Sequence, residues 1–176
     1  GLKRDVYVNV EGNPSRDVAL IASYIFDASV QQIFGALLGG HSLHIIENSL
    51  KENPTELVQY YGTHSIALTD GTPSFLKLLV SPSVEFPKNY QVAQYIIGGE
   101  ALPVTTVEQL INKSSLKPEI TNIYGPTECC VDSTLYTINQ SDSAWKEGSI
   151  VSIGKPMGNQ AVHILDESGK ELPIGI

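Results

Sequence analysis

Short apolar runs alternate with longer segments of helical period from about residue 18 to residue 137. The short runs are rich in β-branched and aromatic residues and predict strands, whereas apolar residues spaced three and four apart predict helices. This alternation is typical of an α/β fold, a mostly parallel sheet with helices on both faces in three αβα layers. The predicted strands are Val18–Tyr24, Ser42–Ile46, Ser65–Thr69, Gln94–Ile97, Ile120–Tyr124 and Ser133–Thr137.

Helices are expected between these strands. The segment Ser29–Leu38 has apolar residues at helical spacing and ends at Gly39-Gly40, a good C-terminal stop. Three further candidates follow a proline, which favours the first turn of a helix. They are Thr55–Tyr61, Ser74–Val80 and Thr105–Asn112.

The pattern changes after residue 138. Asn139–Ser149 is a polar connector, in which Trp145 is expected to pin the loop to the core. Short antiparallel β structure around a turn at 166–169 is predicted next. Its segments are Gly154-Lys155-Pro156, Val162–Leu165 and Leu172-Pro173. We therefore divide the chain into an α/β subdomain, 1–138, and a second unit, 139–176, which holds the connector and the beginning of a small β subdomain.

Composition and charge exclude several classes of protein. A chain of 176 residues suits one domain, and its net charge of -8 disfavours a nucleic acid or a membrane as the main partner. No apolar run approaches the roughly 18 residues of a membrane span, and the first five residues do not resemble a signal peptide, so we expect a cytoplasmic protein.

The cysteines and histidines do not suggest a metal centre or a disulfide. Cys129 and Cys130 are adjacent and poorly placed for a stapling bond, so we expect them to fill space behind a loop, with a reactive thiol as the alternative. The histidines lack metal-ligand spacing and are expected at the surface or at an edge: His41, His44, His64 and His163.

The heptapeptide Asn122–Glu128 is the best indication of function. It follows a predicted strand, and Gly125-Pro126 must break that strand, so its polar side chains lie on a loop at the strand's carboxyl end. Ligands bind at this edge of an open α/β sheet. The ring of Tyr124, the hydroxyl of Thr127 and the carboxylate of Glu128 suit a nucleotide and its metal. An ordinary turn followed by a Thr-Glu cap is the alternative.

Four stretches, in this order, resemble the motifs of the adenylate-forming enzymes, and most closely those of the adenylation domains of nonribosomal peptide synthetases. They are Phe26-Asp27-Ala28-Ser29-Val30, Gly98-Gly99-Glu100-Ala101-Leu102, Asn122–Glu128, and Gly154-Lys155-Pro156 through Leu172-Pro173-Ile174-Gly175. The resemblance extends from about Asp17 to Ile176. It places the family's phosphate loop before residue 1 and its ribose-binding Asp and catalytic Lys after residue 176. We therefore expect an internal piece of such a domain that does not turn over alone.

The resemblance implies ATP or AMP and magnesium as cofactors. It implies that Tyr124 stacks on adenine, that Asn122 lies beside it, and that Gly125 belongs to the same loop. Thr127 would contact the α-phosphate and Glu128 would help to bind magnesium, which makes these two the implied catalytic residues. The backbone of Gly99, Glu100 and Ala101 would border the adenine.

The resemblance also implies an amino-acid pocket. Asp27 would pair with the substrate's α-ammonium group through a charge-assisted hydrogen bond, although an Asp before a helix is also a common N-terminal cap. The other implied pocket residues resemble those of glutamine-activating domains: Ala28, Gln31, Asp70, Ile96, Gly98, Ile123, Val131 and Asp132.

The chemistry of this set agrees with glutamine. Aliphatic side chains would pack its methylenes, and Gln31 with Asp70 and Asp132 would form a polar end with acceptors for a carboxamide. Glutamate is disfavoured, because one like-charge contact costs roughly 4 kcal/mol at an effective dielectric of 20. Ornithine or lysine is the main rival, and the two aspartates could instead be solvated loop residues.

In such an enzyme the amino acid's carboxylate attacks the α-phosphate of ATP, pyrophosphate leaves, and the aminoacyl-adenylate passes to the phosphopantetheine thiol of a peptidyl carrier protein. One alternative is an acyl- or aryl-CoA synthetase, for which Asp27 would have no ammonium to bind. The other is a non-catalytic flavodoxin-like binding module, because fold does not fix function.

Overall fold

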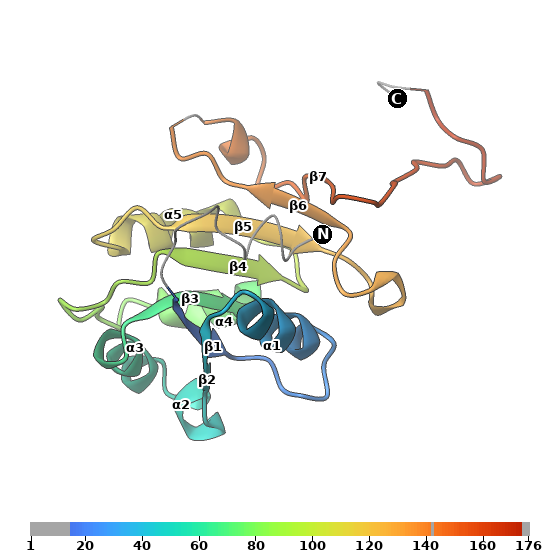
Figure 1. The fold of residues 1–176 in the computed structure, drawn as a ribbon. Coiled ribbons are helices and arrows are strands. Elements are labelled where there is room, and N and C mark those ends of the chain that lie inside the picture. The colour runs from blue at the N-terminus through green and yellow to red at the C-terminus, as the bar shows by residue number, and fades with distance from the viewer. Residues whose placement is uncertain (1–14, 142, 174–176) are drawn as a thin grey trace.

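A computed structural model describes residues 15–141 and 143–173. Their strands form one seven-stranded sheet in the order β2-β1-β3-β4-β5-β6-β7 (Figure 1). The five strands from β2 to β5 are parallel, and β6 and β7 are antiparallel to their neighbours. The strands are β1 Asp17–Leu20, β2 Ser42–Ile45, β3 Ile66–Gly71, β4 Gln94–Gly98, β5 Glu119–Tyr124, β6 Thr134–Thr137 and β7 Lys155–Pro156.

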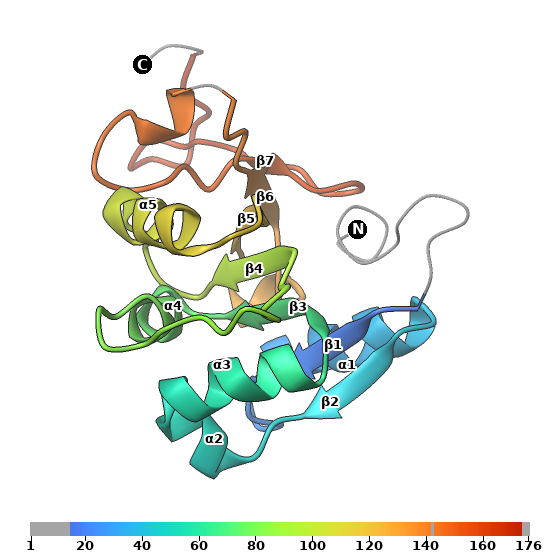
Figure 2. The same cartoon turned by 90° about the vertical axis from the view of Figure 1, so that its left-hand side faces the viewer.

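Helices cover both faces of this sheet, so the predicted three-layer αβα fold is confirmed (Figure 2). One face carries α3, α4 and α5, and the other carries α1. The helices are α1 Ala28–Leu38, α2 Asn48–Glu52, α3 Pro54–Thr63, α4 Pro73–Leu79 and α5 Val104–Lys113, with short 3-10 turns at η2 Thr127–Cys129 and η3 Ala144–Lys146. The short α2 was not predicted from the sequence; the residue before it provides no side-chain cap.

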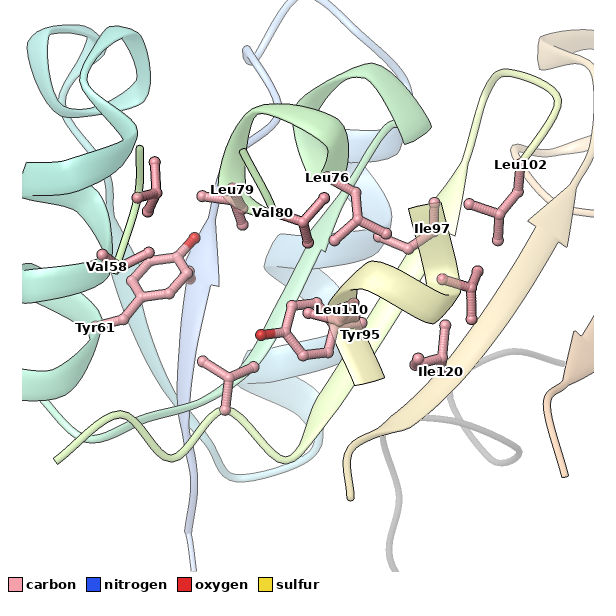
Figure 3. Packing of buried hydrophobic residues seen from close by; sticks show 14 of the residues in the cluster. Val58, Tyr61, Leu76, Leu79, Val80, Tyr95, Ile97, Leu102, Leu110 and Ile120 are labelled. Carbon is pink, nitrogen blue, oxygen red and sulfur yellow. The ribbon is translucent and has the colours of Figure 1, made fainter. Parts of the chain in front are cut away.

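Two hydrophobic clusters flank the sheet because successive residues of a strand point to opposite faces. In β4, Tyr95 and Ile97 belong to the larger cluster, on the side of α3, α4 and α5, whereas Ile96 belongs to the smaller one beside α1. Leu76 and Leu110 are among the helix residues that fill the larger cluster (Figure 3). Burying a side chain of this size contributes about 1.5–3 kcal/mol, so this face holds most of the stabilising contacts.

Helix α1 packs on the sheet through small and polar side chains. Its buried residues are Ser29, Gln32, Gly35 and Ala36. Four of its large apolar side chains lie on the outer face and are 51–62% exposed: Val30, Phe34, Leu37 and Leu38. The small inner residues let the helix lie close to β1 and β2, and they leave an apolar surface turned away from the sheet.

Strand β1 is shorter than the predicted Val18–Tyr24 and ends at Leu20. The physical reason lies in α1: the backbone N–H groups of Ile21 and Ala22 donate to the side-chain oxygen of Gln32 at 3.0 and 3.1 Å. These two N–H groups therefore make no hydrogen bonds to a neighbouring strand. The residues after Leu20 form a loop that passes over the carboxyl edge of the sheet.

The segment after residue 138 returns to the main sheet. Trp145 is 4% exposed and lies in the larger cluster, which confirms that it pins the connector to the core. β7 pairs with β6, so the predicted antiparallel structure begins as an extension of the same sheet. Beyond it, an isolated bridge joins Leu165 to Glu171, and the described residues 157–173 form no further strand. Ile174 and Gly175 lie outside the described residues, and the division at residue 138 stays a prediction.

No helix in the described ranges is long and apolar enough to cross a membrane.

Candidate active site

A cavity of about 440 Å³ opens at the carboxyl ends of the central strands, beside the first turn of α1. Its walls come from the β1–α1 connection, α1, the ends of β3, β4 and β5, and the loop after β5. Parallel strands place their ligand sites at this edge. The predicted site residues that border the cavity are Asp27, Ala28, Gln31, Asp70, Gly98, Gly99, Ile123, Gly125, Val131 and Asp132.

Ile96 does not border the cavity, contrary to the expectation that it contacts the substrate. It lies on the same face of β4 as Gly98 but two residues earlier, where it is fully buried in a cluster with Leu68 and Ile123. The register of the strands explains this position, since Ile96 is opposite Asp70 and Gly98 is opposite Ile123. Ile96 therefore packs beneath the residues that line the cavity and does not itself reach the cavity.

Asp27 caps α1 and also borders the cavity. It is the N-cap of α1, and its Oδ1 accepts a hydrogen bond from the backbone N–H of Ala28 at 2.8 Å. Its side chain also borders the cavity. A carboxylate at the N-terminus of a helix is stabilised by the helix dipole, and its second oxygen can still accept a hydrogen bond from a ligand.

Three polar side chains form the acidic end of the cavity. Gln31 Nε2 lies 3.5 Å from Asp70 Oδ2, a long hydrogen bond, and Gln31 Oε1 is buried with no partner among the described residues. Burial, and secondly the charge of Asp27, raise the pKa of Asp132 to about 7. The end of the cavity is thus rich in acceptors, and it holds one carboxyl group that changes charge near neutral pH.

Alternate residues at the end of β5 face opposite sides of the sheet. Ile123 faces the cavity, whereas Asn122 and Tyr124 face the side of α5. The Asn122 side chain donates to the carbonyl oxygens of Val151 and Ser152 at 3.3 and 2.9 Å, so it holds that segment against the strand. Tyr124 is 50% exposed and leaves one part of its ring open to a ligand.

The loop after β5 is closed tightly on itself. The backbone N–H of Ser133 donates to the carbonyl of Tyr124 at 2.8 Å. A side chain at Gly125 would come within 2.4 Å of the carbonyl of Val131, so the loop needs glycine there. Thr127 and Glu128 are exposed at the tip of this loop, where they can meet a ligand.

The two cysteines do not fill space behind this loop. Cys129 and Cys130 are both exposed, and that expectation was wrong. Cys130 and the next residue, Val131, have positive φ angles of 66° and 75°, which turn the chain so that Val131 and Asp132 reach the cavity. The turn directs the cysteines outward because the pocket residues occupy the inner side.

Gly98 and its neighbours shape a second wall. A Cβ atom at Gly98 would lie 2.6 Å from Ile123 Cγ1, so glycine keeps the cavity open there. Glu100 accepts hydrogen bonds from the backbone N–H and the hydroxyl of Ser74, at 3.1 and 2.5 Å, and so holds the start of α4. Ala101 is exposed beside it. The side chain of Glu100 thus has a structural role, and the predicted contact with adenine falls to the backbone.

Other residues of the site were not identified from the sequence. The wall opposite the strands is made by Ile21, Ala22 and Ser23, and Gln32 and Phe75 also border the cavity. Two adjacent glutamines in an apolar helix could have indicated a polar contact at the site, since a polar group on a packed face needs hydrogen-bond partners. The sequence alone does not show which of the two faces inward.

The histidines lie away from the cavity. His44 Nε2 is 2.8 Å from Asp17 Oδ1, and His163 pairs with Glu171. Within residues 15–141 and 143–173 no three or more His, Cys, Asp and Glu side chains converge as a metal site would require.

A family model described as "AMP-binding enzyme" matches residues 3–176. The chain belongs to the AMP-binding enzymes. Two curated members of similar sequence are bacitracin synthase 1 of Bacillus licheniformis, 38% identical over the whole chain, and surfactin synthase subunit 1 of Bacillus subtilis, 35% identical over 99% of it. The chain spans only 3% and 5% of these two relatives.

Solved structures of AMP-binding enzymes have the same fold. The adenylation domain AlmE of Vibrio cholerae, in complex with glycyl-adenosine-5'-phosphate, matches 98% of the chain with a TM-score of 0.80 at 21% identity. The four-domain nonribosomal peptide synthetase AB3403, bound to AMP and glycine, matches 90% with a TM-score of 0.76 at 27% identity. The chain covers 31% and 11% of those chains. The resemblance to adenylation domains is confirmed.

Proposed function

We propose that this chain is the part of an amino-acid adenylation domain that holds both reactants, ATP and an amino acid, and that the amino acid is glutamine. The observation that carries the proposal is the position of the cavity. Its acidic end and the loop Tyr124–Glu128 are joined through Ile123, Gly125 and Val131. The two reactants would therefore meet at the end of one strand.

The nucleotide side is supported by the exposed groups of the loop. Tyr124 offers a half-exposed ring for adenine, and Thr127 offers a hydroxyl for the α-phosphate. Glu128 makes no hydrogen bond or ion pair with a described residue, which leaves its carboxylate available for a cation. Magnesium fits this donor set, since it is usually bound by one or two carboxylates together with substrate phosphates. Bound there, magnesium would neutralise charge on the phosphates.

The amino-acid side is supported by the distribution of acceptors. Asp27 would receive the α-ammonium group, and the acidic end would receive the side chain. Gln31 Oε1 is a buried acceptor without a donor, a costly state that a ligand N–H would relieve. Asp132 in its neutral form could donate to the carbonyl of a carboxamide, and Asp70 could accept from its amide.

A basic side chain is the second candidate, because Asp70 and Asp132 both border the cavity and could pair with an ammonium. Glutamine fits better where Asp132 is neutral, since a carboxamide needs one donor as well as acceptors. An acyl- or aryl-CoA synthetase is disfavoured, since such acids offer no cation or donor to three carboxyl groups. After adenylation the acyl group would pass to the phosphopantetheine thiol of a carrier protein.

Amino-acid-dependent ATP–pyrophosphate exchange by the full-length protein that contains this chain tests the proposal. We expect glutamine to give the highest kcat/KM at pH 7 among glutamine, glutamate, ornithine and lysine. Exchange should fall at least tenfold in Asp27→Ala, which removes the partner of the α-ammonium group. Higher activity with ornithine or lysine would replace glutamine by the second candidate, and exchange supported by none of the four would reject the proposed pocket chemistry.

A further inference from the structure

The connection between β1 and α1 forms a wall of the cavity although it belongs to no element of secondary structure. Ile21, Ala22, Ser23, Phe26 and Asp27 of this connection all border the cavity. A loop that leaves the sheet loses the ladder partners of its backbone N–H groups, and a buried donor without a partner destabilises the fold. The position of this wall therefore depends on what satisfies its backbone.

One side chain satisfies the first part of the loop. Gln32 lies in the second turn of α1 and is 1% exposed. Its Oε1 accepts from two successive backbone N–H groups, those of Ile21 at 3.0 Å and Ala22 at 3.1 Å. Although Gln32 borders the cavity, both acceptor sites of this oxygen are used by the loop.

The other end of the loop is fixed by the first turn of the same helix. Ser29 Oγ donates to the carbonyl of Phe26 at 2.8 Å, and the N–H of Phe26 donates to the carbonyl of Ser23 at 2.9 Å. Asp27 follows directly and caps the helix. Asp27 thus follows a loop that is anchored near its start by Gln32 and at its end by Ser29, two residues on the buried face of α1.

We propose that Gln32 is a positioning residue of the amino-acid site: through Ile21 and Ala22 it sets the wall of the cavity and the placement of Asp27 toward the substrate's α-ammonium group. This inference rests on the proposed function. The hydrogen bonds of the Gln32 oxygen go to the loop, so its loss should weaken binding of the amino acid and leave the nucleotide side, which lies across β5, unchanged.

The test uses Gln32→Met in the full-length protein, a substitution that keeps the length of the side chain and removes the oxygen. We expect the KM for glutamine in ATP–pyrophosphate exchange to rise about tenfold and the KM for ATP to stay within about twofold. Gln32→Glu keeps an acceptor for both N–H groups and should return the KM for glutamine toward the wild-type value. A general loss of stability would not separate the two KM values in this way.

Gln94 provides a matched control. It is 5% exposed, and its side chain accepts from Arg16 at 2.9 Å and donates to Glu119 at 2.8 Å, but it lies at the amino end of β4, away from the cavity. Gln94→Met should leave both KM values unchanged even if the protein melts at a lower temperature. Equal KM values for glutamine in Gln32→Met and the wild type, a parallel rise in both KM values, or no recovery in Gln32→Glu would overturn the proposal.

Amide hydrogen exchange separates this inference from the proposed function. The peptide 20–28 should exchange faster in Gln32→Met than in the wild type, Gln32→Glu or Gln94→Met. If no amino acid supports pyrophosphate exchange, the proposed function fails, and unchanged amide exchange would independently show that Gln32 does not hold the loop. Should Gln32→Met not fold, Gln32→Asn, whose oxygen is one methylene short of the loop, must give the same results.

Discussion

Asp132 is a cavity residue whose protonation depends on its surroundings. Burial raises the pKa of its carboxyl from 3.8 to about 7, and the charge of Asp27 adds to the rise. Asp70 also borders the same cavity and contributes a further acidic group. Below about pH 7 the Asp132 carboxyl is neutral and can donate a hydrogen bond. Above it, the carboxylate favours a cation.

We expect the proposed preference for glutamine to depend on pH. The ratio of kcat/KM for ornithine to that for glutamine should rise roughly tenfold between pH 6 and pH 8, because ionisation of Asp132 adds a partner for the ornithine ammonium and removes a donor for the carboxamide. Pyrophosphate exchange with both substrates across this range measures the ratio. The α-ammonium group is common to both substrates, so its contact with Asp27 cancels.

Asp132→Asn is the control for this titration. The amide cannot ionise, so the ratio should be flat with pH and should stay at the value that favours glutamine. A wild-type ratio that does not change with pH, or an Asp132→Asn ratio that rises as steeply as the wild type, would contradict the assignment.

At the scale of elements, β7 shows how one backbone position fixes a strand. Gly154 precedes β7 and has a φ of 77°, and a Cβ atom there would lie 1.8 Å from the carbonyl oxygen of Leu135 in β6. Only glycine permits β6 and β7 to pair so closely after this turn. The pairing returns the chain to the main sheet and brings Met157 into the smaller cluster.

Gly154→Ala should lower the melting temperature of the chain by several degrees. The substitution adds both an unfavourable φ and a collision with backbone, together at least about 2 kcal/mol, and each kcal/mol shifts the melting temperature by about 2–4 °C in a chain of this size. Calorimetry measures the shift.

Gly169→Ala is the matched control for this prediction. Gly169 has nearly the same φ, 82°, but nothing lies within 4 Å of its Cβ position. It should show only the conformational cost, about 1 kcal/mol. Equal shifts in the two variants would show that the contact with Leu135 is unimportant.

The sequence predicts the helices and strands well because their periodicity is local. The prediction fails where a contact between distant residues determines where an element ends. The strand Glu119–Tyr124 and the helix Ala28–Leu38 lie close to their predicted bounds. The end of β1 could not be predicted, since it depends on Gln32, ten residues further along the chain. The same holds for the site. The motif residues were identified from the sequence, but which face of α1 packs on the sheet and why the two cysteines point to solvent depend on tertiary packing.

At the scale of the whole molecule, the described residues present a cavity without basic side chains and an exposed apolar face on α1. No Lys or Arg borders the cavity within the described ranges. The outer face of α1 exposes Val30, Phe34, Leu37 and Leu38, and an exposed apolar surface of this kind is typical of protein–protein contacts.

We expect the isolated 176-residue chain to give no measurable ATP–pyrophosphate exchange. The triphosphate and the attacking carboxylate bring negative charge to a site whose described side chains are neutral or acidic, and electrostatic stabilisation of such charge usually contributes more to catalysis than any other single effect. The full-length protein, assayed in parallel with the same amino acids, is the control. Sustained, amino-acid-dependent exchange by the isolated chain would contradict this prediction.

The alternation of residues at the end of β5 has a consequence for how such a protein can diversify. Ile123 borders the cavity proposed for the amino acid, and its neighbours Asn122 and Tyr124 belong to the side proposed for the nucleotide. Because the two sets alternate along the strand, we expect substitutions on the cavity side to change the proposed selectivity and to leave the proposed nucleotide side unchanged. We therefore expect a duplicated copy of this gene to acquire a new substrate through a few point changes that leave the proposed nucleotide side intact.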